Sequence, residues 1–104
     1  MENAAVYSLW TPEEVARELA KKVRQVRLAR NWKQSTLAER SGVTLASLRR
    51  FERTGQISLG NLLKLSFALG RLDDFGSLLL APEAGSVREL EARVSMPKPK
   101  RGTK

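Results

Sequence analysis

Two adjacent arginines, Arg49 and Arg50, carry the side chains best suited to recognition chemistry in this 104-residue chain. A guanidinium group presents planar donors that match the O6 and N7 acceptors of guanine and the oxygens of a phosphate. Arg53 shortly after them, and Lys33 and Gln34 earlier in the chain, add further hydrogen-bond donors. We expect these three to hold phosphates, whereas the adjacent arginines would read base edges.

The composition excludes several kinds of catalysis. The chain has no Cys and no His, so it has no thiol nucleophile, no imidazole base and no metal site built on these residues. No glycine-rich phosphate loop precedes a predicted helix. We therefore expect no enzymatic activity, no cofactor and no metal.

The charge is uneven along the chain. Residues 17–53 carry eleven basic and three acidic side chains, so this part alone reaches the net charge of the whole chain, +8. Residues 65–92 are acidic, with five acidic side chains against two basic ones, and residues 93–104 add five bases. The basic part is suited to a polyanionic partner, and double-stranded DNA is the expected one. RNA is less favoured, because the usual aromatic stacking platform is missing.

Turn and capping signals divide the chain into helical segments. Thr11 supplies an N-cap, followed by Pro12 and by the carboxylate of Glu14, which predicts a helix start. We find no β-hairpin signal, and the sequence predicts an all-α fold. The expected helices cover residues 12–30, with the apolar stripe Val15, Leu19, Val23 and Val26, then 34–41, 45–53, a segment from Ser58 to a stop at Gly70, and 72–80.

Both ends of the chain differ from this helical middle. We expect residues 1–10 to form a short N-terminal arm or strand, residues 11–81 the folded domain, and residues 82–104 a C-terminal extension. Within the extension, Val87, Leu90 and Val94 allow one or two amphipathic turns. The proline-containing basic tail that follows is typical of disorder.

Residues 34–53 meet the steric requirements of two helices that cross through a tight turn. Ala38 is small enough for the crossing, and Gly42 allows a positive φ in the turn. Apolar residues fill the angle between the helices: Leu37, Val43, Leu48 and Phe51. The outward face of the second helix remains polar or small, with Thr44, Ala46, Ser47, Arg49 and Arg50.

These residues make the chain resemble the phage-repressor-like (Cro/C1, or Xre) helix-turn-helix family over about residues 13–80. The resemblance lies in residues 33–43, in the Phe-Glu-x-x-Gly ending at 51–55, and in the leucine-rich segment 62–70. It implies a five-helix DNA-binding domain in which the helix-turn-helix forms helices two and three.

The resemblance also implies roles for individual residues. Gln34 would hold a phosphate, and Glu52 would pair with Arg27 of the first helix. Leu45 replaces a glutamine that many family members have, and its side chain is suited to a thymine methyl group. Base edges would be contacted by Thr44, Leu45, Ala46, Ser47, Arg49 and Arg50.

A single recognition helix reads only a few base pairs, so we expect a homodimer on a two-fold operator. An apolar surface for this dimer, or for another protein, would come from Leu72, Phe75, Leu78, Leu79, Val87 and Leu90.

Residues 71–75 and the basic tail resemble HipB-like antitoxins, which are encoded beside HipA-type kinases. The sequence therefore favours a transcriptional repressor that is the autoregulating antitoxin of a type II toxin–antitoxin pair. The alternative is a stand-alone phage or chromosomal repressor without a toxin partner. No apolar run approaches the roughly 20 residues of a membrane helix, and no signal peptide is visible. We expect a cytoplasmic protein that joins the bacterial nucleoid when bound to its operator.

Overall fold

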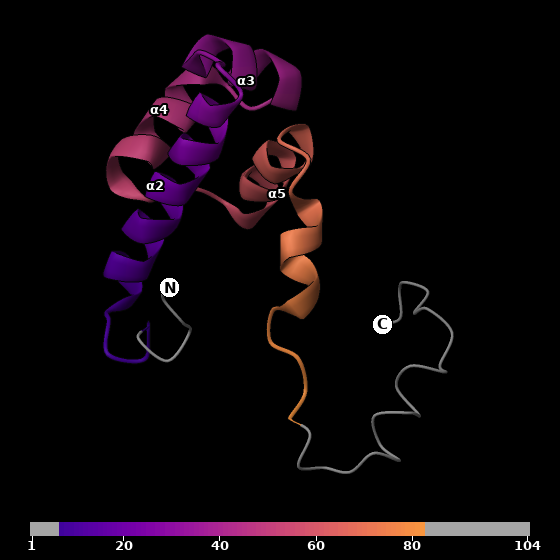
Figure 1. The fold of residues 1–104 in the computed structure, drawn as a ribbon. Coiled ribbons are helices and arrows are strands. Elements are labelled where there is room, and N and C mark those ends of the chain that lie inside the picture. Colours follow the sequence, from indigo (N-terminus) through magenta and orange to yellow (C-terminus); the bar gives the residue numbers. More distant parts are fainter. Residues whose placement is uncertain (1–6, 83–104) are drawn as a thin grey trace, which may run out of the picture.

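The computed structural model describes residues 7–82. This part contains four α-helices followed by one 3-10 helix, and it contains no strand (Figure 1). The α-helices are α2 (Pro12–Ala29), α3 (Gln34–Ser41), α4 (Leu45–Thr54) and α5 (Leu59–Ala68), and the 3-10 helix is η1 (Leu72–Ser77).

The helix starts follow their capping residues. The Thr11 hydroxyl accepts from the Glu14 amide at 3.1 Å, and the Glu14 carboxylate accepts from the Thr11 amide at 2.9 Å. Thr44 and Ser58 cap α4 and α5 through their hydroxyl groups. Each cap satisfies an amide that has no partner within its own helix.

The core lies where all four α-helices meet. α3, α4 and α5 contribute its fully buried side chains, and α2 packs against α4. The buried apolar residues are Ala20, Val23, Leu37, Ala38, Val43, Leu48, Phe51, Leu62, Leu65 and Leu69. Of the apolar stripe expected on α2, only Val23 is fully buried, while Val15, Leu19 and Val26 are half-buried.

Two glycines with positive φ shape the region around α4. Gly42 has a φ of 82° and ends α3 in the left-handed conformation, which starts the turn into α4. Gly55 has a φ of 86° and lies so close to α2 that an added Cβ would be 2.8 Å from the Ala16 carbonyl carbon. The end of α4 is therefore packed directly against the backbone of α2.

The segment after α5 differs from the expected helix over residues 72–80. Only Leu72–Ser77 is helical, and it is a 3-10 helix. Gly76 and Ser77 are poor helix formers, and Leu78 then adopts an extended conformation. Leu79 has a φ of 52° and is 97% exposed. Phe67 of α5 is 72% exposed.

Residues 7–10, which were expected to belong to an arm or strand, form a turn beside α2. The Trp10 amide donates to the Tyr7 carbonyl at 3.0 Å, and the two rings lie 5.0 Å apart. The Tyr7 hydroxyl accepts from Lys22 of α2 at 2.7 Å. Residues 1–6 and the C-terminal extension from residue 83, including Val87, Leu90 and the basic tail, lie outside the described residues.

Candidate nucleic-acid interface

The exposed face of α4 carries most of the side chains expected to read DNA. Leu48 and Phe51 are fully buried, so they fix the helix with its opposite face toward solvent. Thr44, Ala46, Arg49 and Arg50 are exposed, and so is Arg53 in the last turn. Ser47 and Leu45 are half-buried, and Leu45 packs against the core. Part of the Leu45 side chain is thus used for packing, which limits what it offers to a ligand.

A buried ion pair fastens α4 to α2. Arg27 donates to both carboxylate oxygens of Glu52, from Nε at 2.8 Å and from Nη2 at 2.9 Å. The two side chains are only 7% and 5% exposed. The third donor, Arg27 Nη1, binds the Trp32 carbonyl at 2.9 Å. The pair therefore links α2, α4 and the α2–α3 turn, and its two-pronged geometry fixes their relative orientation.

Gln34 connects this pair to the exposed face. Its Nε2 donates to Glu52 Oε1 at 2.9 Å, and its Oε1 accepts from Arg49 Nε at 3.4 Å. The hydrogen bonds thus run from a buried arginine to an exposed one. As a result, the first residue of α3 and the middle of α4 are held together at the surface.

Arg50 turns toward a different element. Its guanidinium donates to the side-chain carbonyl of Gln56, in the connection between α4 and α5. The Gln56 amide in turn donates to the Thr54 hydroxyl at 3.1 Å. Gln56 is not among the residues predicted from the sequence. The sequence feature that could have indicated it is a polar residue directly after Gly55, the glycine that ends α4.

The N-terminus of α3 differs from those of the other α-helices. Lys33 occupies its N-cap, and no side chain there accepts from the first-turn amides. Unsatisfied amides at a helix start attract anions, and a lysine adds positive charge at that point. Lys33 itself is exposed, while Gln34 beside it is half-buried.

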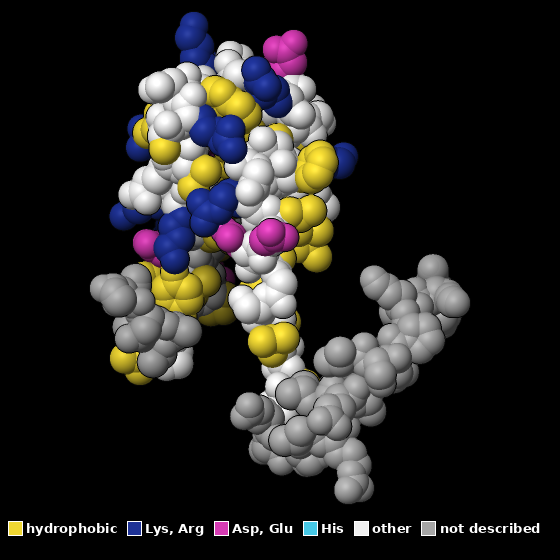
Figure 2. Space-filling view, turned by 45° about the vertical axis from the view of Figure 1, so that its right-hand side comes forward, with side chains coloured by type: hydrophobic (Ala, Val, Ile, Leu, Met, Phe, Trp, Pro, Cys, Tyr) yellow, Lys and Arg dark blue, Asp and Glu magenta, His cyan; other side chains and the backbone are white. Residues whose placement is uncertain are grey.

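Trp32 brings together two further arginines that sequence reasoning did not single out. The guanidinium carbons of Arg30 and Arg40 lie 5.1 Å and 4.7 Å from the centre of its ring. Arg30 also donates to the Leu69 carbonyl at 3.0 Å, which ties the turn to the end of α5. A tryptophan between two arginines in sequence is the signal that would have indicated this cluster. Basic side chains gather on the face of the helical part shown in Figure 2.

We also searched residues 7–82 for metal sites and for membrane-spanning helices. No group of His, Cys, Asp and Glu side chains within that range is arranged to hold a metal ion. None of the helices there is both long enough and apolar enough to cross a membrane. Outside the core, Leu72, Leu78 and Leu79 are exposed, whereas Phe75 is half-buried.

The sequence comparison agrees with this geometry. Residues 23–75 match the family model described as helix-turn-helix. The chain belongs to the helix-turn-helix family. The match is to the Cro/C1-type, Xre-like branch, a family of DNA-binding transcription regulators. No curated protein and no solved structure matches the chain. Within the helix-turn-helix, α3 and α4 are the two paired helices.

Proposed function

We propose that this helix-turn-helix protein is a sequence-specific transcriptional repressor that binds a two-fold operator as a homodimer. The observation that carries the proposal is the exposed face of α4, where Arg49 and Arg50 stand opposite the buried Leu48 and Phe51. A helix of this size fits the major groove, where arginine bonded to guanine is the commonest specific contact. Residues 11–81 form the DNA-binding domain in this proposal.

Phosphate contacts would surround the recognition helix. Lys33 and the free amides at the start of α3 suit a phosphate on one side of the groove. Gln34 and Arg53 add donors, which position the protein without reading sequence. Base edges would face Thr44, Ala46, Ser47, Arg49 and Arg50, with a smaller apolar contribution from Leu45.

The homodimer would form through the exposed leucines of the segment after α5. Leu72 is 42%, Leu78 57% and Leu79 97% exposed, so their side chains offer an unusual amount of apolar surface. Phe75 is half-buried and would add less. Asp73 and Asp74 keep this surface acidic, unlike the basic helix-turn-helix.

An antitoxin role gives the same protein a second partner. The support is the resemblance of residues 71–75 and of the basic tail to HipB-like antitoxins. In this role the repressor would bind a HipA-like kinase encoded nearby and would regulate its own operon.

Selection of DNA fragments by the purified protein tests the repressor proposal. Fragmented genomic DNA from the host is incubated with the protein, and the retained fragments are sequenced. We expect one sequence with two-fold symmetry and half-sites about one helical turn apart to be enriched. Retention of all fragments in proportion to their abundance would contradict sequence-specific binding.

Co-purification from the host tests the antitoxin role. The tagged protein is recovered at moderate salt after nuclease treatment, and its partners are identified by mass spectrometry. A stoichiometric kinase-like protein encoded next to the gene would support an antitoxin. Recovery of the protein alone, from cells that express the neighbouring genes, would favour the stand-alone repressor.

A further inference from the structure

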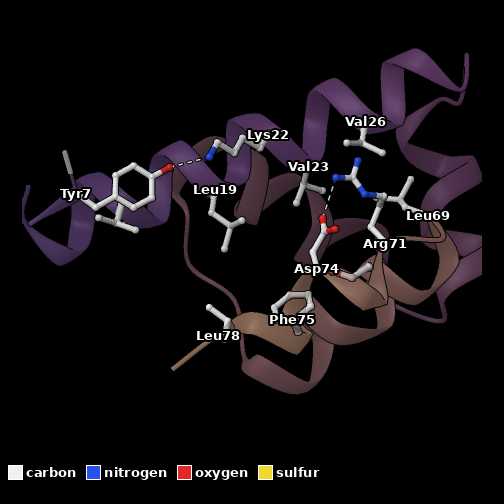
Figure 3. Close-up of a pocket in the computed structure, with 12 residues that line it drawn as sticks. Tyr7, Leu19, Lys22, Val23, Val26, Leu69, Arg71, Asp74, Phe75 and Leu78 are labelled. Carbon is white, nitrogen blue, oxygen red and sulfur yellow. Dashed lines mark hydrogen bonds and ion pairs between the residues drawn. The ribbon is translucent and has the colours of Figure 1, made fainter. Parts of the chain in front are cut away.

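An apolar groove of about 370 Å³ separates α2 from the segment that contains η1 (Figure 3). The hydrogen-bonded pair of Tyr7 and Lys22 lies on its α2 side, and the ion pair of Arg71 and Asp74 lies on the opposite side. Its apolar lining comes chiefly from Leu19, Val23, Val26, Leu69, Phe75 and Leu78.

The groove leaves apolar side chains only partly covered. Leu19, Val26 and Phe75 touch the core but are half-buried, and Leu78 is 57% exposed. This explains why the apolar stripe expected on α2 is only partly buried. A group that fills the groove would remove this surface from water, which is the main favourable term in packing.

The chain itself supplies a segment with matching properties. Residues 83–104 follow Leu78 closely in sequence, and Leu78 already lines the groove. Val87, Leu90 and Val94 are spaced by three and four residues, which places them on one face of a helix. Ser86 and Glu89 have the spacing of a capping box, which marks a helix start at Val87.

The length of the chain before Val87 and the charge of the segment also allow it to lie along α2. Five residues of chain from Pro82 to Val87 span up to about 17 Å, and α2 from Val15 to Val26 rises roughly 16 Å. The segment 87–94 carries two acidic and two basic side chains. α2 carries five basic and three acidic side chains, and its Lys22 lies at the groove. A helix without net charge would therefore meet the basic α2 without repulsion between net charges.

We propose that residues 87–94 form a helix that binds, through Val87, Leu90 and Val94, in the groove between α2 and η1 of the same protomer. This inference does not depend on DNA binding. It assigns Val87, Leu90 and the groove residue Leu78 to the protomer's own core, and of the leucines proposed for the dimer it leaves Leu72 and Leu79 for contact between copies.

Disulfide cross-linking tests the proposal directly, because the natural chain has no cysteine. The full-length variant Leu19→Cys with Leu90→Cys is compared with Leu19→Cys with Ala92→Cys. Ala92 is close to Leu90 in sequence but lies on the opposite face of the same helix. Both variants are oxidised at low protein concentration, after circular dichroism has verified that each keeps the helical content of the natural chain.

The expected result is an intramolecular disulfide that forms at least tenfold faster in the variant with Leu90→Cys than in the variant with Ala92→Cys. Equal rates would overturn the proposal, because they would mean that no particular face of the segment meets α2. A disulfide that joins two chains would also overturn it, because the groove would then hold a segment of a second copy.

Thermal unfolding supplies a measurement without cysteines. Leu90→Ala should lower the unfolding midpoint by about 5 °C or more, because a leucine that packs in a groove loses its contacts. Ala92→Ser is the matched control and should leave the midpoint unchanged. Equal midpoints for Leu90→Ala and the natural chain would contradict packing of Leu90 in the groove.

Discussion

Arg49 and Arg50 are adjacent in sequence, but their side chains bind to different elements. Arg49 donates to Gln34 at the start of α3, and Arg50 donates to Gln56 after the end of α4. Neighbouring residues on a helix point about 100° apart, which allows this divergence. The two guanidinium groups therefore lie on different sides of α4.

The first prediction concerns these two arginines. Arg49→Ala and Arg50→Ala should each weaken operator binding by about 1–3 kcal/mol, which corresponds to roughly five- to 150-fold. Both residues are exposed, so thermal unfolding should be nearly unchanged. Fluorescence anisotropy with operator and with scrambled DNA measures the effect. An unchanged ratio of the two affinities in both variants would refute base reading by these arginines.

Substitution of the residues proposed to bind phosphates should affect DNA binding differently from substitution of the two arginines. Lys33→Ala should weaken binding to operator and scrambled DNA by similar factors, and it should reduce the slope of log K against log salt by about 1. Gln34→Ala should weaken both DNAs but leave the salt slope unchanged, because glutamine carries no charge. The measurement is a salt titration of each variant. A loss confined to the operator would mean that Lys33 takes part in reading sequence.

The ion pair of Arg27 and Glu52 predicts a marked asymmetry between single and double variants. Glu52→Ala should destabilise the protein by about 3–5 kcal/mol, because it leaves a buried guanidinium without its carboxylate. The double variant Arg27→Met with Glu52→Leu should recover much of this loss, since neither charge then remains buried. Urea unfolding of the natural chain, of Glu52→Ala and of the double variant measures these differences in stability. If the double variant is less stable than Glu52→Ala, the cost lies in something other than the unpaired charge.

Two glycine substitutions separate backbone strain from steric contact. Gly42→Ala should cost about 1 kcal/mol, because its φ is positive but an added Cβ meets nothing within 4 Å. Gly55→Ala should cost about 2–4 kcal/mol, because the added Cβ also meets the α2 backbone at 2.8 Å. Thermal unfolding of both variants measures the difference. Equal losses of stability in the two variants would show that the α2 backbone moves away from the added Cβ without a cost in free energy.

Local signals were enough to predict most of the helical architecture. Thr11 and Ser58 cap helices where the sequence indicated that helices begin, and Gly42 and Gly55 end helices as expected. Such signals depend on one or two turns of chain, so they are visible in a single sequence. The length of the last helix was not predicted correctly, because Gly76 and Ser77 outweigh the leucines that follow them.

The site was predictable only as a set of residue types. Sequence indicated Gln34, Arg49 and Arg50, but it did not indicate the hydrogen bonds that draw the two arginines apart. Those bonds depend on how α3 and the α4–α5 connection lie beside α4, which is a tertiary property. The partial burial of Leu45 has the same origin, since the residue begins α4 and also touches the core.

The close approach of Gly55 to α2 has a consequence for the shape of the DNA that the proposed repressor would select. α4 is fixed to α2 by that contact at one end and by the ion pair of Glu52 with Arg27 nearby. In the proposed complex with DNA, α4 would have little freedom to adjust its tilt, so any change of shape needed for a fit would fall on the duplex. Base pairs that the protein never touches would then affect affinity through the stiffness of their stacking.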